Sequence, residues 1–147
     1  MKKNLLITDG SGFIGSYVID YLHDNYNNSV IGSMNATSLK TLNNHSYPYC
    51  YCDYSKASIV ALLSQIKPSA IVHLAAFRPT VYNAINDYYD NLTIGSNLFE
   101  SCLENDIKNV INISTRLVYS QHNPLPWQEN SHITPLGYYG LSKQWVE

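Results

Sequence analysis

The sequence has little charge, few cysteines and no long apolar run, and each shortage removes a class of protein. Only 14% of its 147 residues are charged and the net charge is −2, so no basic surface is expected for nucleic acid or an anionic membrane. No apolar run approaches the roughly 20 residues that a membrane-spanning helix needs. The apolar stretch at 5–7 is also too short for a secretory signal.

The three cysteines, Cys50, Cys52 and Cys102, are an odd number and include no C-x-x-C pair. This pattern argues against a disulfide framework and against a metal site, and it favours a reducing cytoplasm. Much of the polar surface is expected to come from sixteen asparagines and thirteen tyrosines instead. The length suits a single domain with a real core.

Short apolar runs alternate with longer amphipathic stretches along the chain. This alternation predicts an α/β fold, a Rossmann-type doubly wound parallel sheet with helices on both faces. Ligands of such sheets bind beyond the carboxyl ends of the strands. Strands are predicted at 4–8, 29–33, 47–52, 70–74 and 109–114, and helices at 13–25, from 55 to a stop at Pro68, at 87–105 and from 136 onward.

The last predicted helix has no stop signal. Leu141, Trp145 and Val146 keep the helical spacing up to Glu147, and no Gly, Asn or Pro ends the pattern. We therefore expect a fragment that is incomplete at its C-terminus, with a sixth strand and any substrate domain lying beyond this chain.

The stretch LITDGSGFIG, residues 6–15, carries the clearest binding motif. Gly10, Gly12 and Gly15 have the G-x-G-x-x-G spacing between a predicted strand and a predicted helix, the context in which the motif is informative. Glycine allows the tight turn and a close approach of backbone amides to a pyrophosphate. Asp9 places a carboxylate directly before this turn, so we expect weakened binding unless it points away or pairs with a cation. A plain strand–turn–helix is the alternative.

The end of the second predicted strand usually carries an acid that binds the adenosine ribose. Here Ser33, Met34 and Asn35 occupy that place, with no acid and no adjacent arginine for a 2′-phosphate. Ser33 or Asn35 could hydrogen-bond a ribose hydroxyl. The choice between NAD and NADP is therefore open.

Tyr139 and Lys143 form a Y-x-x-x-K pair, which places both side chains on one helix face. The pair is common enough to arise by chance in a chain so rich in tyrosine. Its order relative to Ser114 and Thr115, which end the last predicted strand about two dozen residues upstream, makes it informative, because strand ends carry the chemistry in this architecture.

Six motifs in sequence order resemble the extended short-chain dehydrogenase/reductase family, the NAD-dependent nucleotide-sugar epimerases and dehydratases. TDGSGFIGS is similar to the family's TGGxGFIGS, CDYSK to its acidic motif after the third strand, and VHLAA to its fourth-strand motif. NLTIGSNLFESC, ISTRLVYS and GYYGLSKQWVE are similar to NxxGTxNLLEA, SSxxVYG and NPYGxSKxxxE. The resemblance covers the whole chain, as an N-terminal NAD(P)-binding Rossmann domain at 1–147. Asp9 stands where the family has its first glycine.

The resemblance implies a role for each matching residue. Thr115, Tyr139 and Lys143 correspond to the catalytic residues of a reversible hydride transfer between a nucleotide-sugar and the nicotinamide of NAD, with NADP as the alternative. It also implies a homodimer through the helices around 87–105 and 136–147. The implied cofactor-binding residues are Gly10, Gly12, Phe13, Ile14, Gly15, Asn35, Asp53, Tyr54, Leu74, Ala75, Ala76, Asn91, Tyr139 and Lys143.

Two interpretations compete. The first is the cofactor-binding half of an epimerase, dehydratase or reductase, favoured by the Thr115, Tyr139 and Lys143 set. The second is a non-catalytic or degenerate Rossmann module, favoured by Asp9 and Met34. For single residues, Thr115 could merely cap a strand end, and His73 is interpreted as a strand residue rather than a ligand.

Overall fold

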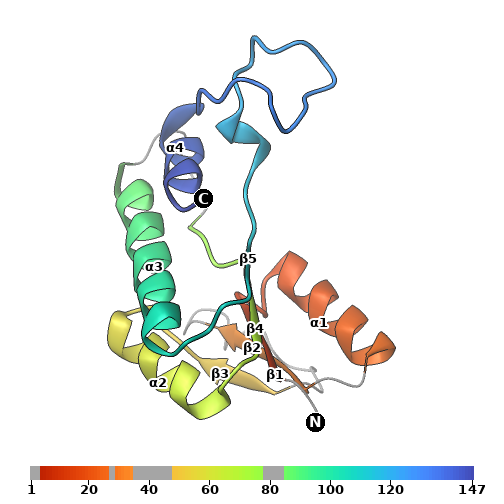
Figure 1. Cartoon of the computed structure of the whole chain (residues 1–147), viewed down its shortest axis with the longest axis vertical. Helices are drawn as coiled ribbons and strands as arrows, with labels where there is room; N and C mark the ends of the chain where they lie inside the picture. The colour runs from red at the N-terminus through yellow and green to blue at the C-terminus, as the bar shows by residue number, and fades with distance from the viewer. Residues whose placement is uncertain (1–3, 27–28, 35–47, 78–84) are drawn as a thin grey trace. The chain divides into compact units, whose positions relative to one another are not determined.

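The structure is a computed structural model that describes residues 4–26, 29–34, 48–77 and 85–147. The chain divides into two compact units (Figure 1). The first comprises Met1–Ala75 with Asn97–Ile113, and the second comprises Ala76–Ser96 with Ser114–Glu147. Asn35, Tyr47 and Arg78 lie outside the described residues.

The first unit is built on five parallel strands in the order β3-β2-β1-β4-β5. In the central strand, Leu6 pairs with Ile31 of β2 on one side and with Ile71 of β4 on the other. The strand order therefore changes direction between β1 and β4, where such sheets bind ligands. The parallel sheet predicted from the sequence is confirmed. The strands are β1 (Asn4–Thr8), β2 (Ser29–Met34), β3 (Tyr49–Tyr51), β4 (Ala70–His73) and β5 (Val110–Asn112).

Helices cover both faces of this sheet, as predicted. In Figure 1, α1 (Phe13–Asn25) lies on one side of the strands and α2 (Lys56–Ile66) on the other. The C-terminal part of α3 (Ile85–Glu104) belongs to the first unit and is tied to α2 by one cation. Lys56 Nζ lies 3.1 Å from Glu100 and 3.0 Å from Glu104.

The limits of α2 follow from local chemistry. The Ser55 hydroxyl accepts a hydrogen bond from the Ser58 amide and caps the helix start. Lys67 adopts the left-handed conformation at the helix end, directly before Pro68. The buried face has the spacing of an amphipathic helix and consists of Ile59, Leu62, Leu63 and Ile66.

Several predicted strand boundaries are wrong by one or two residues. β3 spans Tyr49–Tyr51, within the predicted 47–52, of which residue 47 lies outside the described residues; Pro48 has no amide to donate to a neighbouring strand. β4 ends at His73 because the next two amides bond to the Thr8 hydroxyl instead of a strand. β5 pairs only with β4 in the described sheet, so it spans Val110–Asn112 rather than 109–114.

The second unit contains the N-terminal part of α3, the short 3-10 helix η2 (Arg116–Val118) and α4 (Gly137–Trp145). α4 packs so closely on η2 that a Cβ at Gly140 would lie 2.5 Å from the Leu117 carbonyl oxygen. Figure 1 shows α4 running beside the early turns of α3, and Tyr88 and Tyr138 join the two helices with ring centroids 6.2 Å apart. None of the described helices combines the length and the apolar character needed to cross a bilayer.

Candidate functional site

The turn from β1 to α1 leaves no space for side chains at its glycines. A Cβ at Gly10 would lie 2.6 Å from the Cα of Gly32, and one at Gly15 would collide with the Asp9 carbonyl oxygen. Gly12 is the cap residue before α1 and has no side chain to bond the helix start, so the first amides of the helix remain for a ligand. Ser11 Oγ is buried and has no hydrogen-bond partner among the described residues. Such a turn fits an anion with several oxygen atoms, such as a pyrophosphate.

Asp9 sits inside this turn in an unusual backbone conformation. Its φ of 51° is in the left-handed region, which glycine adopts freely and other residues rarely. Its carboxylate occupies the space that a Cβ at Gly12 would need, so it does not point away from the loop. No cation among the described residues pairs with it, and burial raises its pKa above the usual range. The expected repulsion of a pyrophosphate therefore remains a prediction.

Tyr54, which follows β3, and Ser33, at the end of β2, hold the glycine turn by hydrogen bonds. The Asp9 amide donates to the Tyr54 hydroxyl at 2.8 Å, and the same hydroxyl lies 3.1 Å from Ser33 Oγ. The Gly10 amide donates to the Ser33 carbonyl at 2.8 Å. Tyr54 is predicted to bind cofactor, and the structure places its hydroxyl under the glycine turn. Asp53 is exposed, and hydrogen bonds from Ser55 lower its pKa.

A buried hydroxyl organises the end of β4. Thr8 Oγ1 accepts hydrogen bonds from the amides of Leu74 and Ala75, at 2.9 and 3.1 Å. Because both acceptor positions of the hydroxyl are then occupied, its proton is directed to Nδ1 of His73, 2.8 Å away. The interpretation of His73 as a strand residue is confirmed, since it ends β4 and is buried. Ala76, the next predicted cofactor residue, begins the second unit.

The three predicted catalytic residues all belong to the second unit. Tyr139 and Lys143 lie one turn apart on α4, and Thr115 precedes η2. Lys143 is only 4% exposed, and burial lowers its pKa, although Glu147 acts in the opposite direction. Thr115 accepts a long 3.4 Å hydrogen bond from the Leu117 amide, so it does cap a short helix. Its catalytic role remains a prediction.

Asn91 and Ser142 connect the helix that carries the Tyr–Lys pair to its surroundings. The Asn91 amide group bonds to both backbone groups of Phe77, at 2.7 and 3.0 Å, and donates to Ser142 Oγ at 3.2 Å. Ser142 in turn donates to the Tyr139 carbonyl at 2.8 Å. Asn91, predicted to bind cofactor, is thus engaged by protein groups. The sequence analysis did not predict a role for Ser142, whose only signal in the sequence is its position directly before Lys143.

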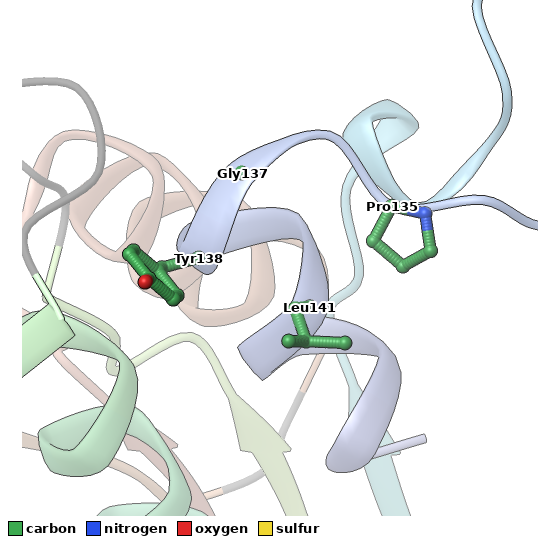
Figure 2. A pocket seen from close by; sticks show the side chains of 4 residues that line it. All are labelled: Pro135, Gly137, Tyr138 and Leu141. Carbon is green, nitrogen blue, oxygen red and sulfur yellow. The ribbon is translucent and has the colours of Figure 1, made fainter.

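A pocket of about 430 Å³ lies on another face of α4. Figure 2 shows Pro135 in the loop before the helix and Tyr138 and Leu141 on the helix itself. Gly137 completes the lining. None of the residues predicted for catalysis lines this pocket, so sequence reasoning gave no indication of it.

The parallel sheet and the glycine turn at its switch point define a Rossmann-type domain, and the sequence comparisons identify the family. A family model described as NAD dependent epimerase/dehydratase matches residues 5–147. The chain belongs to that family.

Relatives in sequence and in structure are consistent with this assignment. A UDP-glucose 4-epimerase from Cyamopsis tetragonoloba is 30% identical over 99% of this chain and 45% of its own length. A UDP-N-acetylglucosamine 4-epimerase from Methanobrevibacter ruminantium has 31% identity and a TM-score of 0.83, covering 100% of this chain and 49% of that one. The Bacillus cereus UDP-N-acetylglucosamine 4-epimerase has 30% identity and a TM-score of 0.81, covering 99% and 52%. The chain thus spans about half the length of these relatives.

We predict that Asp9→Asn stabilises the folded chain at neutral pH and that this advantage disappears in acid. Because burial raises the pKa of Asp9 in the folded chain above its ordinary value in the unfolded chain, the folded chain holds this proton more tightly. The stability from this carboxyl is therefore complete below the unfolded pKa and is lost as the pH rises through the raised pKa.

Urea unfolding between about pH 3 and about pH 8 measures this difference. The curves of wild type and Asp9→Asn should meet in acid, separate as the pH rises from the unfolded pKa to the raised folded pKa, and stay apart above it. Asp90→Asn, which removes an exposed carboxyl from α3, is the matched control and should follow wild type more closely. Parallel curves for wild type and Asp9→Asn would contradict the prediction.

Proposed function

We propose that this chain is the cofactor-binding part of an NAD-dependent epimerase that acts on a nucleotide-sugar by reversible hydride transfer. The observation that carries the proposal is the glycine turn without room for a Cβ, at the switch point of the sheet in a member of this family. Relatives at about 30% identity are named as UDP-sugar 4-epimerases, which favours a UDP-sugar over other nucleotide-sugars. It also favours epimerisation over dehydration or reduction.

The first unit would hold the dinucleotide. The backbone at Gly10, Gly12 and Gly15 would receive the pyrophosphate, and the buried Ser11 hydroxyl would gain a hydrogen-bond partner there. The exposed side chains of Phe13 and Ile14, at 81% and 56%, flank the same helix start. NAD, when bound, supplies a nicotinamide ring that exchanges hydride with the sugar.

The second unit would carry the proton chemistry. Tyr139 would take the proton from the sugar hydroxyl as tyrosinate, and Thr115 would hydrogen-bond the same oxygen. Thr115 Oγ1 accepts its cap bond, so its own proton remains to be donated. Lys143 would stabilise the tyrosinate through its positive charge.

The burial of Lys143 supports catalysis over the second candidate, a dinucleotide-binding module without activity. An ammonium group that is 4% exposed and whose pKa is lowered by desolvation costs folding stability. Groups with such perturbed pKa values concentrate at functional sites. Asp9 is the observation that favours the inactive module, because it opposes pyrophosphate binding.

The proposal extends to the cellular location and the binding partners of the chain. Cys50, Cys52 and Cys102 are all free of disulfides, which supports a reducing, cytoplasmic location. The proposed small-molecule partner is a nucleotide-sugar. The proposed macromolecular partner is a second copy of the chain.

We predict that the chain binds NAD with a micromolar dissociation constant and that Asp9→Gly binds about tenfold more tightly. Removing the carboxylate next to Gly12 relieves a repulsion that corresponds to about 1.4 kcal/mol. Calorimetric titration with NAD and with NADP measures both effects.

Asp9→Asn separates charge from backbone, because it removes the charge and keeps a side chain at this position. Asp24→Asn, an exposed carboxyl near the end of α1, is the control and should leave the affinity unchanged. Binding by neither wild type nor Asp9→Gly would contradict the proposed cofactor site.

We predict a homodimer whose interface contains the exposed apolar side chains of α4 and of the residue directly before it. Leu136, Tyr138 and Trp145 are 41%, 36% and 69% exposed, and Tyr138 also lines the pocket of Figure 2. On the neighbouring turns of α3, Ile85 and Tyr89 are 45% and 57% exposed. Burying such side chains between two copies is favourable.

Light scattering at increasing protein concentration tests the homodimer. Wild type should reach twice the mass of the chain, and Trp145→Asp should shift the association to at least about tenfold higher concentration. Tyr21→Asp, which adds the same charge at a 59% exposed position on α1, should dimerise normally. A monomer at all concentrations would contradict the prediction.

A further inference from the structure

Two residues far apart in the sequence share a rare backbone conformation and are bonded to each other. Asp9 and Tyr54 have φ angles of 51° and 62°, in the left-handed region that residues other than glycine seldom adopt. The Asp9 amide donates to the Tyr54 hydroxyl at 2.8 Å across 45 residues of sequence. Lys67 and Asp106, which also have positive φ, follow the ends of α2 and α3, where this conformation is ordinary. Asp9 and Tyr54 end no helix.

The Tyr54 hydroxyl is fixed by its surroundings. The side chain is 8% exposed, and the hydroxyl lies 3.1 Å from Ser33 Oγ. Burial raises the pKa of Tyr54 to about 12, so the hydroxyl keeps its proton and can donate it to Ser33 while accepting from Asp9. The backbone of Tyr54 is held as well, because Asn97 Nδ2 donates to its carbonyl at 3.0 Å.

This arrangement explains how a residue with a side chain occupies the first position of the turn. Glycine reaches the left-handed conformation without steric cost, and the resembling family motif has glycine at this position. At Asp9 the conformation has to be held by an added interaction, and strained backbone at binding sites persists where neighbouring groups fix it. The Tyr54 hydroxyl supplies this interaction, because it accepts a hydrogen bond from the Asp9 amide and so fixes the orientation of that amide. The Asp9 carbonyl accepts a hydrogen bond from the Gly12 amide at 2.9 Å.

We propose that Tyr54 is a positioning residue of the glycine turn, whose hydroxyl holds Asp9 in the left-handed conformation that glycine would adopt unaided. Asp9 and Tyr54 therefore act as a compensating pair. The consequence for dinucleotide affinity rests on the proposed function, whereas the consequence for the folded turn does not.

A double-mutant cycle of Tyr54→Phe and Asp9→Gly tests the pair. Phe keeps the buried ring and removes only the hydroxyl. NAD titration should show about a tenfold weaker affinity for Tyr54→Phe than for wild type, but less than about a twofold loss when the same change is made in Asp9→Gly. Urea unfolding should show the same dependence, with a larger loss of stability in the Asp9 background.

Two control variants distinguish the loss of the Tyr54 hydroxyl bond to Asp9 from the loss of other hydroxyl groups. Tyr51→Phe removes the hydroxyl of a 53% exposed tyrosine in β3 and should change neither measurement. Ser33→Ala removes the other partner of the Tyr54 hydroxyl and leaves the bond to the Asp9 amide, so urea unfolding should show a smaller loss of stability than for Tyr54→Phe.

Equal effects of Tyr54→Phe in both backgrounds would overturn the inference. If no variant binds NAD, the proposed cofactor site is wrong, and the urea-unfolding cycle alone then tests the pairing of Asp9 and Tyr54. Coupled losses of stability would support the pairing, and additive losses would overturn it. If Tyr54→Phe does not fold, Asp9→Gly must restore folding, and failure of the double variant would also overturn the inference.

Discussion

The turn between β1 and α1 is the constraint on which the sheet and the proposed site both depend. The Asp9 carbonyl lies against Gly15, Gly10 lies against Gly32 of β2, and the Gly10 amide bonds to Ser33. These contacts join the start of α1 to two strands within a few residues. The turn stands at the point where the strand order changes direction, which is where such sheets bind ligands, and it leaves the start of α1 without a side-chain cap.

Two residues at or near the predicted site reduce folding stability where an apolar or neutral residue would not. Asp9 keeps a half-buried carboxylate in a left-handed turn, and Lys143 keeps an ammonium group almost fully buried. Natural proteins retain such costs mainly where function requires them. For Lys143 the tyrosinate chemistry supplies a reason. For Asp9 the described residues show how the turn tolerates it, through Tyr54, but nothing in the structure explains why an aspartate stands at this position.

Local signals predicted the fold well, and tertiary contacts account for the differences. The limits of α1 follow from the glycine motif and the apolar spacing, and β1 from a short apolar run, so both agree with the sequence analysis. The end of β4 depends on the Thr8 hydroxyl, which bonds to amides 66 and 67 positions away, and no local pattern contains such contacts. The support of Asp9 by Tyr54, and of α4 by Asn91 and Ser142, could not be predicted for the same reason.

The most direct test of the central claim is a titration of the isotope-labelled chain with NAD, followed by the backbone amide resonances of the turn. If the turn receives the pyrophosphate, the amide resonances of Ser11, Phe13 and Ile14 should shift most, together with those of their neighbours Gly10, Gly12 and Gly15. The resonances of amides at the exposed C-terminal end of α1 should not shift. Binding that shifts other amides while leaving the turn unchanged would contradict the account.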